Sequence, residues 1–179
     1  NAPDYESNKT IYHFTASVND SSYTVEQNIT ININNINDGV PIFTSDNNAS
    51  VDENKRNAID LNASDTDGDT LTYSISGGAD NGSFNIDSST GEVTFKNAPD
   101  YESNKTTYTF IAMVSDVDSN DTQTITIDIN NINDNKPEFK NNSTTSVDEN
   151  QYDAIELNVS DADNTPIHLN DLIYSISGG

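Results

Sequence analysis

The sequence predicts an all-β protein made of seven-stranded Greek-key β-sandwiches joined end to end. Three observations support this fold class: a long internal repeat, short segments in which apolar and polar residues alternate, and intervening turns rich in Gly, Asn, Asp and Ser. About seven short strands in one repeat is the strand count of a β-sandwich. No segment has the apolar period of an amphipathic helix.

The repeat sets the expected domain boundaries. Residues 1–38 recur almost unchanged at 97–134, an offset of 96 positions, and the motif VDEN at 51–54 returns at 147–150. A period of this length is a whole folding unit, because solenoid repeats are much shorter. We therefore expect the C-terminal part of one repeat at 1–38, a complete repeat at 39–134 and the N-terminal part of the next at 135–179. On this interpretation the sequence is a slice of a longer covalent array.

The expected strands are segments in which every second residue is apolar. The clearest is 123–129, where Ile125, Ile127 and Ile129 share one face. Four further segments show the same alternation, and in each the apolar residues would share one face of a strand. These residues are Ile29, Ile31 and Ile33; Tyr108, Phe110 and Ala112; Ile59, Leu61 and Ala63; and Leu71, Tyr73 and Ile75. A hairpin is expected from Phe84 to Phe95 around a turn at 88–91.

Composition restricts the partners. Thirty Asp and Glu against seven Lys and Arg give a net charge of -23, which repels nucleic acid and favours cations. There is no cysteine for disulfides or thiolate metal sites. No stretch approaches the roughly 20 apolar residues that span a bilayer, so no membrane contact is expected within this sequence. We expect an extracellular or cell-surface location.

The acidic residues gather at strand ends and turns, at 52–54, 65–69, 100–102, 115–116 and 131–135. Carboxylates so close in sequence repel one another unless water separates them or a multivalent cation neutralises them, and Ca²⁺ takes about 6 to 8 oxygen ligands. Acidic turns on a solvated surface are the alternative for any single cluster. Residues 65–70 begin like an EF-hand loop, but that loop needs glycine at its sixth position and glutamate at its twelfth, and Thr70 and Ser76 stand there.

Together the clusters resemble the motifs of the cadherin repeat. The family's x-E-x, D-x-D, D-R-E or D-Y-E, late x-D-x and interdomain D-x-N-D-N motifs correspond, in the same order, to Glu53, Asp65 and Asp67, Asp100 and Glu102, Asp116, and residues 131–135. The family's F-x-I-D-x-x-T-G-x-I hairpin resembles residues 84–93. The resemblance covers the whole chain and implies immunoglobulin-like, cadherin-type sandwiches of a microbial surface-adhesin type.

In cadherins calcium lies between successive domains, so the resemblance assigns ligands to two joints. At the first joint, residues 35–39, the implied ligands are Asp4, Glu6, Asn35, Asn37, Asp38 and the Gly39 carbonyl, with Asp65, Asp67 and Asp116 from the next repeat and Asp69 as a further candidate. At the second joint, residues 131–135, they are Glu53, Asp100, Glu102, Asn131, Asn133, Asp134 and Asn135, with Asp161 and Asp163 from the next repeat and Asn164 as a further candidate.

Charge balance suggests the number of ions. Combining the motifs, a complete joint gathers seven carboxylates, which about three Ca²⁺ ions balance to within one unit. Asn35 and Asn131 stand where the family motif begins with Asp, which removes one negative charge from each joint. We therefore expect weak calcium affinity.

Catalysis has little support in the sequence. His13 and His168 are the only histidines and occupy non-equivalent positions, and without cysteine there is no nucleophile–base pair to propose. Paired carboxylates can serve glycoside hydrolysis, but here they recur in each repeat, in turns that the family devotes to calcium. We expect no enzymatic activity.

Two functions remain. The first is a calcium-rigidified extender in a large adhesin or surface filament, which holds a distal binding domain away from the cell. The alternative is a binding module that itself engages a glycan or a partner cadherin-like domain, including homophilic contacts. A recognition site should show apolar or aromatic residues outside the strand pattern. None is evident in the sequence, which favours the extender and further covalent repeats as its neighbours.

Sugar attachment is a further candidate property. Eleven N-x-S/T sequons occur, and seven of them carry an acid two residues before the asparagine, like the extended acceptor of bacterial N-glycosylation. These seven are Asn8, Asn28, Asn48, Asn62, Asn104, Asn120 and Asn158. The alternative is an Asn-rich, acid-rich composition multiplied by repeat duplication.

Overall fold

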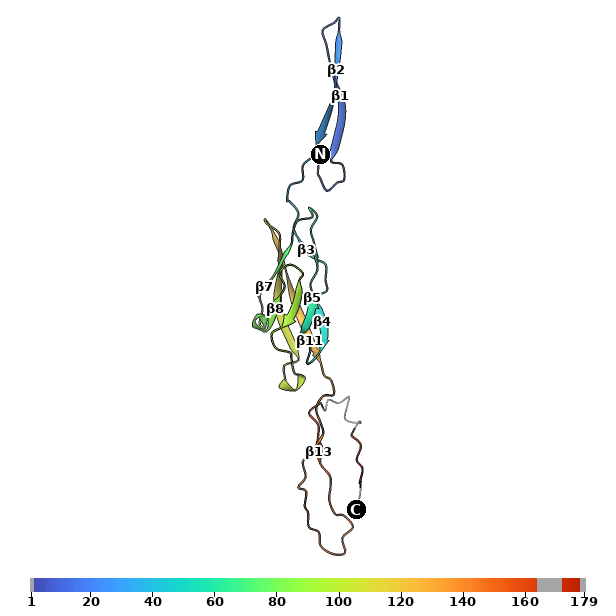
Figure 1. Ribbon diagram of the computed structural model, residues 1–179, viewed down its shortest axis with the longest axis vertical. Coiled ribbons are helices and arrows are strands. Elements are labelled where there is room, and N and C mark those ends of the chain that lie inside the picture. Colours follow the sequence, from blue (N-terminus) through green and yellow to red (C-terminus); the bar gives the residue numbers. More distant parts are fainter. Residues whose placement is uncertain (1, 164–171, 178–179) are drawn as a thin grey trace.

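The computed structural model describes residues 2–163 and 172–177 and shows an elongated molecule with three parts in a row (Figure 1). A two-stranded hairpin lies at the N-terminal end, a β-sandwich in the middle, and an extended segment at the C-terminal end. Apart from the 3₁₀ turns η1 (Asn81–Ser83) and η2 (Tyr101–Ser103), the regular structure of the described residues is β-strand. The all-β prediction is confirmed.

The middle sandwich consists of two sheets and a short extra pair. The four-stranded sheet has the order β4 (Asn48–Asp52), β11 (Asn120–Asn130), β10 (Thr107–Ser115) and β7 (Thr72–Gly77). The three-stranded sheet has the order β5 (Asn57–Asp60), β9 (Glu92–Phe95) and β8 (Phe84–Ile86), and β3 (Ile42–Phe43) pairs with β6 (Ala63–Ser64). Strands β4 and β11 are parallel, and the other pairs are antiparallel. Because β3 and β4 belong to one extended segment and β5 and β6 to another, the sandwich has the seven predicted strands.

The core lies between the two sheets. Ile125, Ile127 and Ile129 of β11 are buried, and every second residue of β10 from Phe110 to Val114 is buried beside them. The predicted 84–95 hairpin forms as β8 and β9, and it packs Phe84 against Phe110 with ring centroids 4.6 Å apart. The alternation predicted for these strands therefore describes the core correctly.

The strand predicted from the alternation of Ile59, Leu61 and Ala63 is wrong in detail. Strand β5 pairs with β9 as far as Asp60, with a register shift between Asn57 and Ile59, and the chain then pairs with β3 from Ala63, in β6. Leu61 lies in this gap and is fully buried, and its N–H donates to the Gly91 carbonyl at 3.0 Å. The segment changes partners here, so the apolar pattern alone does not reveal the break.

The outer parts repeat elements of the sandwich at the same offset of 96. Strands β1 (Ile11–Asn19) and β2 (Thr24–Asn32) correspond to β10 and β11 with the same register, and β12 (Glu138–Phe139) with β13 (Val159–Ser160) corresponds to β3 with β6. Phe14 is 51% exposed, whereas its counterpart Phe110 is fully buried. The β1–β2 hairpin thus has the strand geometry of a repeat without the opposite sheet. The division into three repeats stays a prediction.

Candidate metal centres

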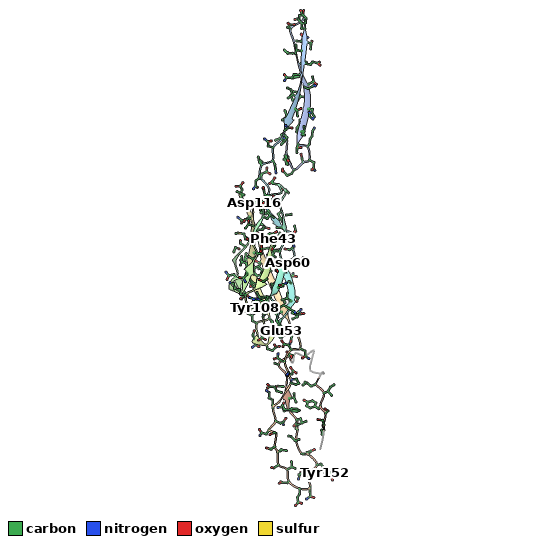
Figure 2. All side chains as sticks on the ribbon, viewed as in Figure 1. Phe43, Glu53, Asp60, Tyr108, Asp116 and Tyr152 are labelled. Atoms are coloured by element: carbon green, nitrogen blue, oxygen red, sulfur yellow. The ribbon has the colours of Figure 1, made fainter. Side chains whose placement is uncertain are left out.

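The predicted ligands gather at opposite ends of the middle sandwich. Figure 2 shows Glu53 at the end that faces the C-terminal segment and Asp116 at the end that faces the hairpin. Both ends are built from turns and from a connecting segment: residues 35–39 lead into the sandwich, and residues 131–135 lead out of it. Residues far apart in sequence therefore meet at each joint.

Two overlapping carboxylate groups form at the second joint. Glu53, Asp100 and Glu102 offer oxygens within 4.8 Å of one another, and so do Glu102, Asp134 and Asp163. The η2 turn positions Glu102, because the Asp100 side chain caps the turn and accepts the Glu102 N–H at 3.1 Å. Glu102 is common to both groups, so it lies between two candidate cation positions.

Glu53 is the buried anchor of the second joint. Its side chain is fully buried, and its two oxygens accept the backbone N–H groups of Tyr101 at 2.8 Å and Ile132 at 2.9 Å. Each carboxylate oxygen has a second lone pair, so these hydrogen bonds leave acceptor capacity for a cation. Glu53 thereby connects β4, the η2 turn and the segment that leaves the sandwich.

Asp163 attaches the C-terminal segment to the same place. It is 2% exposed, and its Oδ2 accepts the Asn135 N–H at 2.7 Å, while the Asn131 amide donates to its backbone carbonyl at 3.3 Å. Burial alone raises the pKa of Asp163, but the hydrogen bonds from Asn135 outweigh it and hold the pKa below its usual value. The hydrogen bonds from Asn135 thus favour the ionised carboxylate.

The first joint repeats this geometry 96 positions earlier. Asp67 takes the place of Asp163: the N–H groups of Asp38 and Gly39 donate to its Oδ2 at 3.0 and 2.7 Å, and the Asn35 amide donates to its carbonyl at 3.2 Å. Carboxylate oxygens of Glu6, Asp38 and Asp67 lie within 4.8 Å of one another. A second group combines the oxygens of Asp65, Asp67 and Asp69.

Negative charge is uncompensated at both joints. Burial, followed by the nearby Asp65 and Asp67 charges, raises the pKa of Asp69. Burial likewise raises the pKa of Glu102, and the Glu53 charge adds to the effect against a lowering hydrogen bond from its own N–H. Among the described residues the ion pairs are Lys105 with Asp80 and Lys140 with Glu138, and both lie outside the four carboxylate groups. In the part of the chain that the structure describes, no ion pair involves the acids of these groups.

Buried oxygens without donors test whether a cation fits. Within the described chain, eight buried side-chain oxygens lack a hydrogen-bond partner, and seven belong to predicted or candidate ligands. These seven are on Glu6, Asn37, Asp65, Asp67 and Asp69 at the first joint and on Glu102 and Asn131 at the second. A buried acceptor without a donor costs about 1–3 kcal/mol, whereas a hard cation coordinates such oxygens directly. All of the atoms that could coordinate a cation at the two joints are oxygens, which is the ligand type that Ca²⁺ prefers.

Three predicted carboxylate ligands, Asp4, Asp116 and Asp161, lie outside the close carboxylate groups. Asp4 and Asp161 accept the N–H groups of Glu6 and Asp163, both at 3.1 Å, and so position those ligands. Asn133 is exposed beside the second joint. Asn164, like His168, lies outside the described residues.

Asp116, the third of these carboxylates, is held in its own turn. Its Oδ1 accepts the N–H groups of Ser119 at 2.6 Å and Asp118 at 2.7 Å, and the Ser119 hydrogen bond is the main reason that the pKa of Asp116 is lowered. The Ser119 hydroxyl lies 2.8 Å from Asp116 Oδ2, to which it donates, and 3.3 Å from the Gly39 carbonyl. Asp116 therefore contacts the first joint through Ser119.

Sequence reasoning missed Asn54. Its side-chain amide donates to Asp134 Oδ2, and its backbone is left-handed with φ of 63°. The sequence could have indicated Asn54, because it follows Glu53 in the VDEN motif and asparagine adopts a left-handed backbone more readily than most residues. Asn150, its counterpart in the second VDEN, has φ of 68°.

The seven acid-preceded sequon asparagines are all exposed, which a modifying enzyme requires. They lie on all three parts of the molecule. Exposure is equally expected of unmodified polar residues.

The sandwich and its carboxylate groups define an immunoglobulin-like β-sandwich domain with oxygen-rich cation sites at both ends. The family model of the Cadherin domain matches residues 47–130. Residues 47–130 therefore match the Cadherin domain, which the motifs had indicated. The family consists of extracellular adhesion domains, and calcium binding is general among them.

Two curated relatives match parts of the chain. Human Protocadherin-15 is 37% identical over 83 residues, which is 45% of this chain and 4% of that protein. Mouse Protocadherin Fat 4 is 34% identical over 123 residues, which is 63% of this chain and 2% of that protein. The chain thus spans a very small part of the curated relatives it matches.

A solved structure shows the same fold over most of the chain. The mouse Cadherin-23 EC22-24 structure is 25% identical, with a TM-score of 0.63, and the match covers 92% of this chain and 57% of that chain. The relatives are mammalian, so the expected microbial surface-adhesin type is not borne out. The expected extracellular location is confirmed. Within the described residues, no helix has the length and apolar character needed to cross a membrane.

Proposed function

We propose that this chain is a calcium-rigidified extender segment of a larger extracellular adhesion protein. The observation that carries the proposal is the set of buried, donor-free oxygens at both ends of the sandwich. Without a cation these oxygens repel one another and favour separation of the parts that meet at each joint. With calcium the same oxygens become shared ligands, so the joint becomes stiff.

In the proposed joint each side of the molecule supplies part of the coordination. Glu53, Asp100, Glu102 and Asp134 come from the sandwich at the second joint, and Asp163 comes from the C-terminal segment. Calcium supplies positive charge and flexible coordination by 6 to 8 oxygens. We propose that a joint containing all of the family motifs binds about three calcium ions. We also propose that the predicted ligands coordinate these ions.

The division into repeats supports the extender interpretation. We propose residues 1–38 and 135–179 as parts of cadherin-like repeats on either side of the complete repeat at 39–134. Strands β1 and β2 precede β10 and β11 by 96 positions, and β12 and β13 follow β3 and β6 by 96 positions, which supports this division. The elongated arrangement in Figure 1 suits a spacer, and we propose no enzymatic activity.

Solution dimensions and thermal melting test the function. Small-angle X-ray scattering and calorimetry are measured on the whole chain with calcium and with a chelator, at constant ionic strength. We expect calcium removal to leave the 39–134 sandwich folded, to lower its melting temperature, and to broaden the distribution of end-to-end distances. Added sodium chloride is the control for screening without coordination. Unchanged dimensions and an unchanged melting temperature in chelator would refute the calcium-dependent extender.

We also propose N-linked glycans on the seven exposed, acid-preceded sequons. The intact mass of protein from its natural source, before and after enzymatic removal of N-glycans, measures this. A mass near the 19.5 kDa of the polypeptide in a molecule of the same sequence would exclude modification.

A further inference from the structure

One asparagine of the middle sandwich has a neighbour that none of the others has. Asn81 is the one asparagine in the sequence that glycine follows, as Gly82. The two residues lie in the η1 turn between β7 and β8, and both are exposed. A Cβ added at Gly82 would meet nothing within 4 Å, so the space beside this residue is open. The Asn81 side chain therefore has room to turn back toward the backbone nitrogen of Gly82.

Neither the side-chain amide of Asn81 nor the backbone nitrogen of Gly82 is held in place. Within the described part of the chain, no hydrogen bond engages the Asn81 side chain or the Gly82 N–H. The Lys96 ammonium donates to the Gly82 carbonyl at 2.8 Å. A positive charge beside this residue favours loss of the proton from its N–H, which makes the nitrogen a better nucleophile.

Two asparagines that precede alanine show what this combination adds. Ala63, which follows Asn62, donates its N–H to the Tyr73 hydroxyl at 3.0 Å, so its nitrogen is engaged. Asn97 and Ala98 are both exposed, but alanine has a Cβ that crowds the approach to its nitrogen and restricts its backbone. Exposure alone therefore does not distinguish Asn81, whereas an open glycine with a free N–H does.

We propose that Asn81 is a site of spontaneous deamidation that produces isoaspartate. The Gly82 nitrogen attacks Cγ of Asn81, so that a new C–N bond forms and the Cγ–Nδ2 bond breaks. Ammonia leaves and carries away the proton of the Gly82 N–H. Water then opens the cyclic succinimide at either carbonyl and gives aspartate or isoaspartate. One water is consumed and one ammonia is released, so the reaction needs no enzyme, oxidant or metal ion.

The modification should loosen the attachment of η1 to β10. Asp80 makes this attachment, because its N–H donates to the Thr109 carbonyl and its carboxylate accepts the Thr109 N–H, both at 2.9 Å. The Ser83 N–H closes the turn on the Asp80 carbonyl at 2.8 Å. Isoaspartate inserts an extra carbon into the main chain inside this turn and adds a negative charge next to Asp80. We expect the melting temperature of the modified chain to fall by about 4 °C.

Timed peptide mapping of the whole chain tests the proposal. The chain is produced without N-glycans, because Asn81 also begins a sequon, and is kept at neutral pH and body temperature. Mass spectrometry locates the gain of about 1 Da at each asparagine, and an isoaspartate-specific methyltransferase labels the isoaspartate. We expect the reaction at Asn81 to be at least about tenfold faster than at Asn97.

Two variants separate the role of glycine from that of the asparagine. Gly82→Ala places a Cβ in open space, so the fold is kept while the reaction at Asn81 should slow at least about tenfold. Asn81→Gln should abolish it, because the longer side chain forms a cyclic imide far more slowly. The melting temperature should fall during storage in the chain with its original sequence and stay constant in both variants.

The outcomes decide the proposal in both of its parts. A reaction at Asn81 no faster than at Asn97, or equally fast in Gly82→Ala, overturns the site. Conversion of residue 81 with an unchanged melting temperature overturns the effect on the η1 attachment. Equal rates in chelator and in calcium are expected, since no step involves a cation, so failure of the proposed calcium function would leave this result intact.

Discussion

Oε2 of the Glu53 carboxylate lies 2.8 Å from the backbone nitrogen of Tyr101, in a hydrogen bond that joins the end of β4 to the η2 turn. Its other oxygen accepts the N–H of Ile132, where the chain leaves the sandwich. A single buried carboxylate thus holds three backbone segments at the second joint. These hydrogen bonds give Glu53 a structural role that does not need a cation.

Glu53→Gln should destabilise the sandwich even in chelator. The amide has the same size but replaces one acceptor oxygen with a donor, which leaves one of two buried backbone N–H groups without a partner. We expect a loss of about 2 kcal/mol in the free energy of unfolding, measured by denaturant titration. Glu92→Gln is the matched control, because Glu92 is exposed on β9. Equal stability of the two variants would contradict the anchoring role of Glu53.

Asp134→Asn should weaken calcium binding at the second joint at least about tenfold, or about 1.4 kcal/mol of binding free energy. The change keeps the side-chain size and removes a charge from the carboxylate group with Glu102 and Asp163. Asp87→Asn is the control, because Asp87 only caps the β8–β9 turn through the N–H groups of Ser89 and Thr90. Calorimetric titration of both variants measures the difference, and equal affinities would remove Asp134 from the site.

Asp80 should contribute a pH-dependent part of the stability. Burial raises its pKa, but the hydrogen bond from Lys105 and that from the Thr109 N–H outweigh it, so the pKa is lowered from 3.8. A lowered pKa in the folded state means that the contribution is present above pH 3.8 and is lost as the pH falls below it.

The test compares unfolding of Asp80→Asn with that of the unmodified chain, in chelator, from pH 7 to pH 2. We expect the variant to be less stable by about 1 kcal/mol at pH 7 and the difference to shrink below pH 3.8. Asp60→Asn, at an exposed position of β5, is the control. A difference that grows as the pH falls would show that the sign is wrong.

Gly91→Ala should destabilise the sandwich by about 2 kcal/mol or more, measured by thermal and denaturant unfolding. Gly91 has φ of 77°, and an added Cβ would collide with the Leu61 carbonyl and reach the Tyr73 ring at 3.4 Å. The collision would also disturb the hydrogen bond from the Leu61 N–H to the Gly91 carbonyl. Gly82→Ala is the control, because its added Cβ would meet nothing within 4 Å. Similar losses in the two variants would contradict this account.

Much of the fold and of the candidate site could be predicted because both depend on short-range patterns. Alternation over a few residues predicted the buried faces of β10 and β11, and the turn at 88–91 predicted the β8–β9 hairpin. The acidic motifs predicted which residues would meet, and Glu6 with Asp67, or Glu102 with Asp163, are indeed brought together. The break between β5 and β6 could not be predicted, because it depends on which strand lies alongside.

By itself the sequence determined the repeat period, the strand pattern and the set of acidic turns, because each is a local property of residue order and charge. Only the tertiary structure decided what each oxygen contacts. Glu53 is an anchor because two backbone N–H groups from distant segments point at it, and Asp67 has a free oxygen where Asp163 is capped by Asn135. Hydrogen bonds act over about 3 Å, so identical motifs acquire different chemistry according to the side chain that packs beside them.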